Sequence, residues 1–387
     1  MHKQISKSCV LSTFILVGSL LSFSGCAMQV KSPETQIKQL VAPAGFGLVT
    51  RGGSDDEAVD CVDLPEPYTE SLSMRSKYEG SGKSRADINK KAMLSYKQHT
   101  ADVRDFEKYS IGLSDKVLKG KPGAGKCLVK LLENWAGADA LMNDEVNHIG
   151  EAVRKWALAC ASLSYLKLNL AEPQTITADQ KEVIEDWLYD LSVEVQKYYT
   201  DRPLKKVNNH DYWAAWAVMS ASVALQKQEL FDWAVMKYRE GVGQIDASGY
   251  LPNELRRKQR ALEYHNFALQ PLVMIAVFAD ANGLDLASEH QGALGRLTKR
   301  VVDGLNDSTP FTLLTGREQK VEGLLNPWSV AWVAPYAATF DSIALADLPE
   351  LPPEQLKASR LGGNLSRMFK ASTHKKDTKD QVSDESS

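Results

Sequence analysis

The sequence predicts an all-α protein, and three observations lead to this prediction. Apolar residues recur every three or four positions through most of the chain after Ile88, strand-like alternation is nearly absent, and turn-forming clusters separate the periodic stretches. Helices that follow one another through short connections pack as antiparallel hairpins. Periodicity alone equally allows a helical solenoid, although the absence of a fixed-length repeat counts against one.

The first 27 residues have the pattern of an export signal. Lys3 and Lys7 give a positively charged start, and the apolar stretch over 10–23 is too short to span a bilayer comfortably. Two processing routes stay open: ordinary cleavage after Ala27, or cleavage at a lipobox-like sequence that leaves a lipidated Cys26. Either route places the mature chain outside the cytoplasm, and only the second route, through the lipid on Cys26, gives it a membrane contact.

Three segments lie outside the helical pattern. Residues 28–66 contain Gly and Pro and are weakly periodic, so we expect an extended arm over the surface. The Gly/Ser-rich segment 79–84 has the composition of a mobile lid. Residues 370–387 are polar and charged, and we expect them to be disordered. One domain is therefore expected over 28–369.

The clearest periodic stretches predict where the helices lie. Turn-forming clusters at 201–203, 246–249 and 281–283 separate several of them. The helices are predicted over residues 146–168, 180–198, 212–225, 229–242, 259–279 and 288–302.

Charge and cysteine content limit the partner and the compartment. The formal net charge is −3, so the whole protein does not attract a polyanion, and binding an acidic polymer requires a local basic patch. Beyond the leader three cysteines remain, two of which we expect to pair in an oxidising compartment. Cys61 and Cys127 lie in polar segments flanked by Gly or Pro, whereas Cys160 lies in an apolar helical stretch and is expected to be a buried free thiol.

Two segments some fifty residues apart carry the richest chemistry. The first contains Asn209 and His210, and the second contains Arg257 and Tyr264. Together they supply an amide, an imidazole, a guanidinium and a phenol. An enzyme needs such groups to remove a proton beside a carboxylate and to expel a sugar oxygen.

Each group has an expected role in such an elimination. Asn209 and Arg257 are suited to neutralising the carboxylate, because an amide donates hydrogen bonds and a guanidinium is a permanent cation. His210, with an intrinsic pKa near ~6.5, can share this task or act as the base. Tyr264 can protonate the leaving oxygen, or take the first proton if it is deprotonated beside Arg257. The sequence leaves open which of His210 and Tyr264 is the base.

The spacing agrees with a shared site and also with ordinary structural roles. Arg257 and Tyr264 are seven residues apart, which is two turns along one face of a helix. Asn209 and His210 open another helix, where Asn208 or Asn209 can serve as the cap and His210 as a polar first-turn residue. Tyr264 can equally be a half-buried helical aromatic, and Arg257 a surface cation.

The motifs around these residues resemble those of a known family. Asn-Asn-His, Tyr-Trp-Ala-Ala-Trp, Leu-Pro-Asn-Glu-Leu and Arg-Ala-Leu-x-Tyr-His-Asn occur together, and further matching stretches lie at 76–80, 154–158, 204–206, 230–235 and 360–363. On these motifs the chain resembles the periplasmic alginate lyases that act on poly(β-D-mannuronate), over nearly all of its mature length. The resemblance implies a periplasmic protein whose antiparallel helical hairpins form an incomplete α/α toroid with a substrate groove.

The resemblance also implies roles for individual residues. The family's catalytic group matches Asn209, His210, Arg257 and Tyr264. Lys77 and Tyr78 match the contacts of its lid, and Lys77 is expected to touch a substrate carboxylate. The family has cysteines at the places of Cys61 and Cys127, which completes the prediction of a disulfide between them.

Sugar binding requires flat apolar faces beside charge donors. Trp156 and Trp213 are predicted to stack under sugar rings, whereas packing between helices is the favoured interpretation for Trp216. Arg360 is expected to bind a carboxylate further along the groove, with a capping or surface role as the alternative.

Three features are not expected to carry chemistry. Residues 120–127 have the Gly and Lys spacing of a P-loop, but Cys127 stands where Ser or Thr is needed and no apolar strand precedes them, so we expect a loop that carries half of the disulfide. His148 lacks a second ligand at zinc-site spacing. His265 is expected to point away from Tyr264 and to be structural.

The resemblance implies an exported lyase that cleaves mannuronate-rich alginate by β-elimination and leaves an unsaturated uronate at the new non-reducing end. It implies neither a metal nor an organic cofactor, and no nucleic-acid partner. By analogy, the enzyme clears polymer from the periplasm, near an alginate export assembly. Two alternatives stay open: a lyase for another polyuronate such as glucuronan, and a non-catalytic polysaccharide-binding or scaffold protein.

Overall fold

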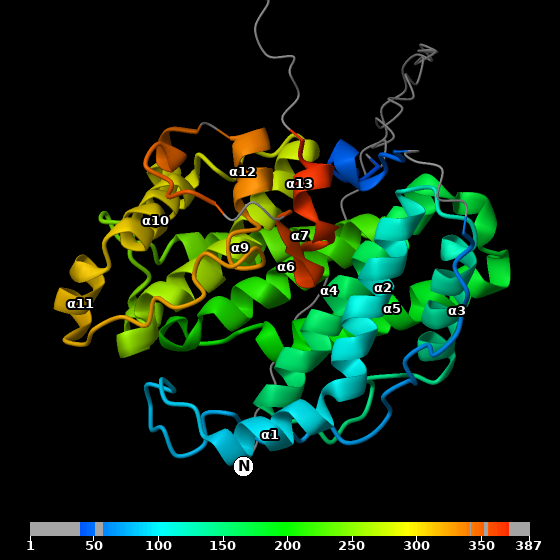
Figure 1. Cartoon of the computed structure of the whole chain (residues 1–387), viewed down its shortest axis with the longest axis horizontal. Helices are drawn as coiled ribbons and strands as arrows, with labels where there is room; N and C mark the ends of the chain where they lie inside the picture. Colours follow the sequence, from blue (N-terminus) through cyan, green and yellow to red (C-terminus); the bar gives the residue numbers. More distant parts are fainter. Residues whose placement is uncertain (1–38, 51–56, 341, 352–354, 371–387) are drawn as a thin grey trace, which may run out of the picture. The chain divides into compact units, whose positions relative to one another are not determined.

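The computed structural model describes residues 39–50, 57–340, 342–351 and 355–370. The chain is helical almost throughout these residues, as predicted, and their one sheet pairs two short antiparallel strands, β1 (Lys357–Ala358) and β2 (Gly363–Asn364) (Figure 1). The helices are α1 (Lys90–His99), α2 (Ala101–Val117), α3 (Ala124–Gly137), α4 (His148–Ala171), α5 (Ala178–Tyr199), α6 (Asn209–Leu225), α7 (Gln228–Val242), α8 (Pro252–Leu255), α9 (Ala261–Ala281), α10 (Glu289–Asn306), α11 (Thr309–Thr315), α12 (Val333–Thr339) and α13 (Leu365–Met368). No helix among the described residues combines the length and the apolar character of a membrane span.

All six predicted helices are present, as α4, α5, α6, α7, α9 and α10, with ends at most four residues from the predicted ones. Local polar groups set these ends, which apolar periodicity does not detect. The Thr177 side chain, for example, accepts a hydrogen bond from Gln180 in a capping box and starts α5 two residues early. In α10 the left-handed residues His290 and Gln291 break the first turn, so regular helix begins after them.

Helix α6 lies at the centre of the helical packing and packs against α4, α5, α7 and α9 (Figure 1). Every residue of α6 is buried except His210. A helix that is apolar on all sides must be enclosed by its neighbours, and small residues such as Ala214 and Ala217 allow them to approach closely. The N-terminus of α6 is therefore a fixed platform on which His210 is the one accessible residue.

The N-terminal arm and the disulfide tie irregular segments to the helices. In the described part of the arm, Phe46 is fully buried against Phe278, and the side chain of Gln226 bonds both the N–H and the carbonyl of Leu40. The predicted Cys61–Cys127 disulfide is present, and Cys160 is a buried free thiol as expected.

Cys127 lies in the first turn of α3 rather than in a loop, because the glycine-rich segment ends where the helix begins at Ala124. The predicted signal, the beginning of the predicted arm and the predicted disordered tail lie outside the described residues, so these remain predictions.

Candidate active site

The candidate site begins at the N-terminus of α6, where Asn208 is the cap. Its side-chain oxygen accepts a hydrogen bond from the backbone N–H of His210, and Asp211 accepts one from the backbone N–H of Asn208. This capping box decides between the two asparagines that could serve as the cap. Asn209 is therefore free for another task.

Asn209 is held by a buried carboxylate that the sequence analysis did not single out. Glu254, in α8, accepts from the backbone N–H of Asn209 at 2.7 Å and from its Nδ2 at 3.0 and 3.1 Å. Burial raises the pKa of Glu254, and the hydrogen bonds from Asn209 only partly oppose this. The amide nitrogen expected to reach a substrate carboxylate is thus bound to Glu254, and Oδ1 of Asn209 is buried without a partner among the described residues.

His210 contacts a buried lysine on α4. Its Nδ1 lies 3.0 Å from Nζ of Lys155, which also lies 2.7 Å from the hydroxyl of Tyr199. Burial lowers the pKa of His210 well below its usual range, and the positive charges of Lys155 and Arg257 lower it further. His210 is therefore a neutral imidazole at neutral pH.

Arg257 and Tyr264 meet, but not along one helix as predicted. Lys258 has a left-handed φ of 52°, and α9 begins only at Ala261, so the chain turns between the two residues. The guanidinium carbon of Arg257 nevertheless lies 3.7 Å from the ring centroid of Tyr264. One nitrogen of Arg257 donates to the carbonyl of Arg85, while Nε is buried without a partner among the described residues. Arg257 forms no ion pair with a described carboxylate, which leaves its charge for a ligand.

Tyr264 shares a hydrogen bond with Tyr78, whose hydroxyl oxygen lies 2.8 Å from that of Tyr264 and also accepts from Arg260. Burial raises the pKa of Tyr264 well above its usual range, although Arg257 acts in the opposite direction. Burial also raises the pKa of Tyr78, but the positive charges of Lys77 and Arg260 outweigh it and the net pKa is lowered. The two phenols therefore differ in acidity across one hydrogen bond.

The predicted lid, residues 79–84, lies between two anchored ends. On one side the N–H of Asn89 donates to the carbonyl of Lys77 at 2.9 Å, and on the other the carbonyl of Arg85 accepts from the guanidinium described above. Nζ of Lys77 lies 5.2 Å from the ring centroid of Tyr78. Lys77 and Tyr78, which directly precede the segment, thus bring one cation and one phenol to the site, and movement of the segment stays a prediction.

Trp156 and Arg360 lie together beside His210. The Trp156 ring is half-buried with its centroid 6.0 Å from that of His210, and its Nε1 has no partner among the described residues. The guanidinium carbon of Arg360 lies 3.9 Å from the Trp156 ring, and Nε and Nη2 donate to the two carboxylate oxygens of Glu107 at 2.9 and 3.1 Å. Arg360 is therefore already paired with a carboxylate, and in this arrangement it supports Trp156 rather than presenting a free fork to a uronate.

Trp213 does not present a face to a sugar. It is 2% exposed, and its Nε1 donates to the backbone carbonyl of Phe267 at 3.1 Å. The favoured interpretation of Trp216 is confirmed, since it is fully buried between helices. Phe267 lies at the centre of this aromatic cluster, with ring centroids 5.0 Å from Trp213, 6.2 Å from Tyr264 and 6.5 Å from Trp156. Trp213 thus fixes Phe267, which joins the two halves of the site.

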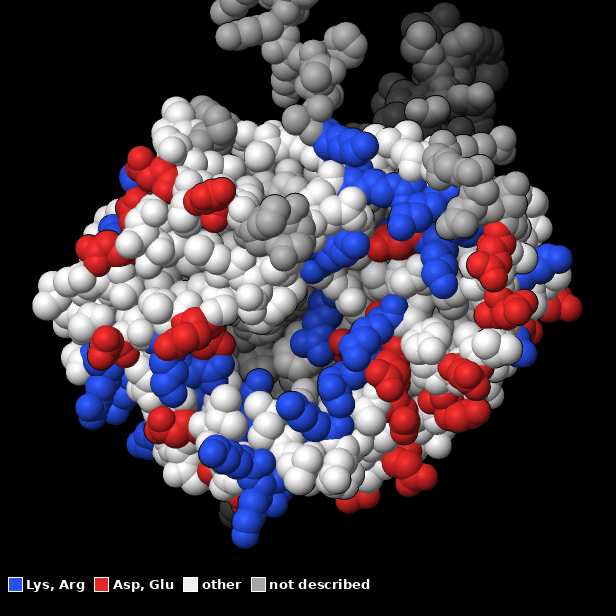
Figure 2. Space-filling model, in the orientation of Figure 1, with Lys and Arg blue, Asp and Glu red and all other residues white. Residues whose placement is uncertain are grey.

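A cavity of about 240 Å³ extends from this aromatic cluster. Its wall includes Trp328, which is 51% exposed and offers the accessible indole face that Trp213 lacks. The lining residues are Arg104, Glu107, Lys108, Trp213, Phe267, Gln270, Trp328, Ala358, Ser359 and Arg360. The cations of the cavity outnumber its one carboxylate, Glu107, which is already paired with Arg360. Arg104 and Lys108 therefore leave a net positive charge, which suits an acidic sugar. Figure 2 shows Lys and Arg side chains gathered around a hollow in the middle of one face, although the net charge is negative.

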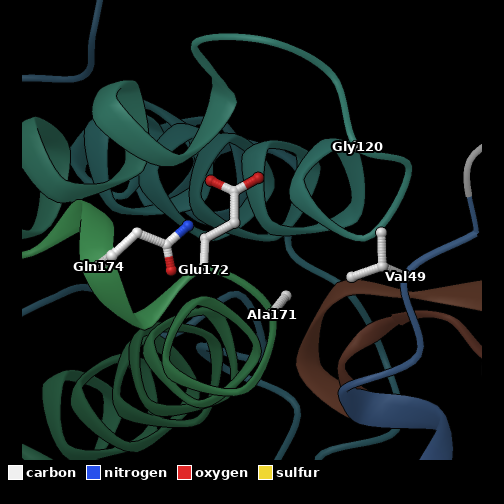
Figure 3. Close-up of a pocket in the computed structure, with 5 residues that line it drawn as sticks. All are labelled: Val49, Gly120, Ala171, Glu172 and Gln174. Carbon is white, nitrogen blue, oxygen red and sulfur yellow. The ribbon is translucent and has the colours of Figure 1, made fainter.

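A second cavity, of about 620 Å³, is a poor candidate for an acidic ligand. Glu172 and Gln174 are its polar side chains, and its other lining residues are Val49, Gly120 and Ala171 (Figure 3). It contains no cation among its lining residues, and the carboxylate of Glu172 repels an anion. None of the predicted site residues lies in it.

The features set aside by the sequence analysis have structural roles. Nε2 of His265 accepts from the N–H of Leu251 at 2.8 Å, and Nδ1 contacts the carbonyl of Ala261 at 2.8 Å, so this buried imidazole fixes the start of α8. Its structural role is confirmed. Near the P-loop-like segment, the N–H of Val59 donates to the carbonyl of Pro122, and the carbonyl of Val59 lies against Gly123, so the arm occupies the space beside this glycine.

Sequence reasoning missed several residues of the site. Lys155 and Glu254 stood inside motifs that had been noted, and the signal available was a charged residue in an otherwise apolar helix or beside a predicted catalytic group. Nothing local distinguished Arg260 from Arg257, because both follow α8 as basic residues. Trp328 lies in an irregular segment without periodicity.

Comparison with known proteins identifies the family. Residues 73–311 match the family model described as alginate lyase. The chain is 39% identical to the alginate lyase of Pseudomonas paraeruginosa over 362 residues, covering 93% of this chain and 98% of the relative. It is 39% identical to the alginate lyase of Cobetia marina over 364 residues, covering 92% and 95%.

Solved structures of alginate lyases have the same fold as this chain. Alginate lyase A1-III from Sphingomonas species A1 superposes with a TM-score of 0.69 at 24% identity, covering 86% of this chain and 91% of that chain. A variant of A1-III complexed with tetrasaccharide superposes with a TM-score of 0.71 at 24% identity, covering 86% and 91%. The fold is the expected incomplete α/α toroid. With a family model that matches more than half of its length, the chain belongs to the alginate lyase family.

Proposed function

We propose that this protein cleaves mannuronate-rich alginate by β-elimination and leaves a 4,5-unsaturated uronate at the new non-reducing end. The observation that carries the proposal is the stacking of Arg257 on Tyr264, with the guanidinium carbon 3.7 Å from the ring centroid. It puts an unpaired cation beside the phenol that can exchange a proton with the sugar. Family membership supports alginate as the substrate.

The first task of such a reaction is to neutralise the uronate carboxylate. Loss of the C5 proton otherwise builds a second negative charge beside the first. Arg257 is suited to this task because its Nε is buried without a partner among the described residues. His210 adds a neutral imidazole next to it, and the local excess of cations attracts the acidic polymer.

The second task is proton transfer, which we assign to Tyr264. Burial keeps its hydroxyl protonated, as an acid for the leaving O4 must be. Tyr78, 2.8 Å away, is the more acidic phenol and ionises first, and Arg260 stabilises its phenolate. To act first as the base, Tyr264 passes its proton to this phenolate, and the phenolate of Tyr264 then takes the proton from C5. In mannuronate the C5 proton and O4 leave from one face of the ring, so one phenol serves both. In guluronate they do not, and this supports a mannuronate preference.

We also propose that the protein works outside the cytoplasm, in the periplasm. Two observations support this: the export-signal pattern of the first 27 residues and the Cys61–Cys127 disulfide, which persists in oxidising compartments. Both processing routes, soluble or lipidated at Cys26, remain compatible with it. Clearance of alginate near an export assembly is the corresponding cellular role.

The test compares the wild type with Tyr264→Phe on three polymers: mannuronate blocks, guluronate blocks and glucuronan. Elimination creates a C=C bond conjugated with the carboxylate, so ultraviolet absorbance rises as the reaction proceeds. We expect the fastest rise on mannuronate, and its loss in Tyr264→Phe with polymer binding retained. A faster rise on glucuronan would show that the substrate is this other polyuronate. Binding of polymer without any rise in absorbance would show that the protein is a non-catalytic binding protein.

A further inference from the structure

Lys155 is a buried lysine without a carboxylate partner among the described residues. Its side chain is fully buried in α4, and the neighbours of Nζ are the hydroxyl of Tyr199 at 2.7 Å and Nδ1 of His210 at 3.0 Å. Two other buried lysines differ, since Lys167 pairs with Asp115, and Lys237 pairs with acidic side chains. Burying an amine without a counterion costs free energy. We therefore expect Lys155 to have a function at His210 that offsets this cost.

Aromatic faces take the place of a counterion at this amine. Nζ lies 5.1 Å from the ring centroid of Trp156 and 4.8 Å from that of Tyr199, distances at which a cation is attracted to the ring. Tyr199 is itself buried, and burial raises the pKa of its hydroxyl well above the usual range, so it keeps its proton. The group at Lys155 is thus enclosed and its hydrogen bonds can be counted.

Counting donors and acceptors shows that Lys155 donates a hydrogen bond to Nδ1 of His210 whether its amine is charged or neutral. A charged ammonium has only protons to offer, so it donates to Nδ1 of His210. A neutral amine has one lone pair, and the proton of the Tyr199 hydroxyl needs that acceptor because no other described group is hydrogen-bonded to it. The amine then again donates to Nδ1. For the neutral amine, the reverse arrangement leaves the buried hydroxyl proton of Tyr199 without an acceptor, which is the more costly outcome.

We propose that Lys155, backed by Tyr199, is a positioning residue that donates to Nδ1 of His210 and keeps the imidazole proton on Nε2. His210 then meets the substrate as a hydrogen-bond donor and cannot accept the C5 proton at Nε2. This inference rests on the proposed function and assigns the base to Tyr264. The neutral state of His210 agrees with it, because only one ring nitrogen carries a proton.

The direct test is nitrogen NMR of the wild type with ¹⁵N-labelled histidine, assigned by comparison with His210→Gln. We expect Nδ1 of His210 in the unprotonated form and Nε2 in the protonated form at neutral pH. A protonated Nδ1 overturns the proposal. This readout needs no variant of Lys155 to fold and no turnover, so it stays separate from the test of the proposed function.

The kinetic test uses Lys155→Met, which keeps an unbranched side chain as far as Cε but removes the donor. We expect kcat on mannuronate blocks to fall about tenfold or more with little change in KM, since the bond from Nε2 strengthens as charge develops. In the same variant the NMR signals of His210 should move toward a mixture of tautomers. An unchanged tautomer together with wild-type kcat overturns the proposal.

Lys167→Met is the matched control, because Lys167 is also fully buried in α4 but pairs with Asp115 instead of His210. It should lower stability while the His210 tautomer stays as in the wild type. If Lys167→Met shifts the tautomer as much as Lys155→Met does, the effect comes from general loosening of α4 and the proposal fails. If the wild type turns over no polyuronate, the proposed function fails while the tautomer result still stands.

Discussion

The hydroxyl oxygens of Tyr78 and Tyr264 lie 2.8 Å apart, although the two residues are 186 positions apart in the chain. The bond joins the segment before α1 to α9, and Arg260 donates to the same Tyr78 oxygen. Tyr78 is thus more than a lid contact, because it is the hydrogen-bond partner of the predicted acid.

Tyr78→Phe should therefore lower kcat about tenfold or more, since the proton of Tyr264 loses the partner to which it can pass. The ring remains in place, so the stacked cations should be little disturbed. Initial rates of the rise in ultraviolet absorbance on mannuronate blocks measure the effect.

Tyr238→Phe provides the control for loss of a buried phenol, because Tyr238 donates to the carbonyl of Leu286 and belongs to α7. It should lower stability slightly and leave kcat unchanged. Wild-type kcat in Tyr78→Phe would remove Tyr78 from the proton path.

Glu254→Ala should reduce both stability and activity. It removes the acceptor of three hydrogen bonds from the backbone N–H and the amide of Asn209, and unpaired buried donors cost about 1–3 kcal/mol each. Urea unfolding and kcat check the two effects. Glu289→Ala is the comparison, since it breaks a more exposed ion pair with Arg239, worth about 0–1 kcal/mol. Equal losses in the two variants would show that Glu254 has no special relation to Asn209.

The contribution of His265 to stability should fall as the pH drops from about 6.5 toward about 4. Burial lowers the pKa of His265 to about 4 from its ordinary 6.5, so in this window the unfolded chain binds a proton that the folded chain does not. This contributes up to ~3 kcal/mol, and the lowered pKa of His210 acts in the same direction. Urea unfolding across this range should give a shallower pH dependence for His265→Gln than for the wild type. Parallel curves would contradict the assignment.

The fold was largely predictable, because each long helix carries its own apolar periodicity. Helices α4 to α7, α9 and α10 follow from residues within each helix, and the buried α6 is apolar on all sides. Arrangement in a toroid did not follow from periodicity, which allows a solenoid equally well. It came from the resemblance of motifs such as Asn-Asn-His and Leu-Pro-Asn-Glu-Leu.

The site was predictable only as a set of residue types. Arg257 and Tyr264 meet through a turn at Lys258 rather than through a shared helix face, so the predicted contact is present for a different reason. Lys155 and Glu254, the hydrogen-bond partners of His210 and Asn209, lie on other elements. Their contacts depend on how the helices pack against one another, and residue spacing along the chain does not predict that packing.

Loss of the Cys61–Cys127 disulfide should lower the stability of the protein, and its effect on activity should be smaller. Cys61 and Cys127 are 66 residues apart, and closing such a loop contributes about 4 kcal/mol in the chain-entropy model. The double variant Cys61→Ser/Cys127→Ser should unfold at lower urea concentration. Reductant should destabilise the wild type and Cys160→Ala but not the double variant. A double variant that still responds to reductant would contradict this assignment.

Mass spectrometry of the products from mannuronate blocks tests the central claim most directly. Elimination adds no water, so the masses of the two fragments should sum to the mass of the parent chain, with the unsaturated sugar on one of them. Fragments whose masses sum to the parent chain plus one water, or an intact polymer after prolonged incubation, would contradict a lyase built on Arg257 and Tyr264.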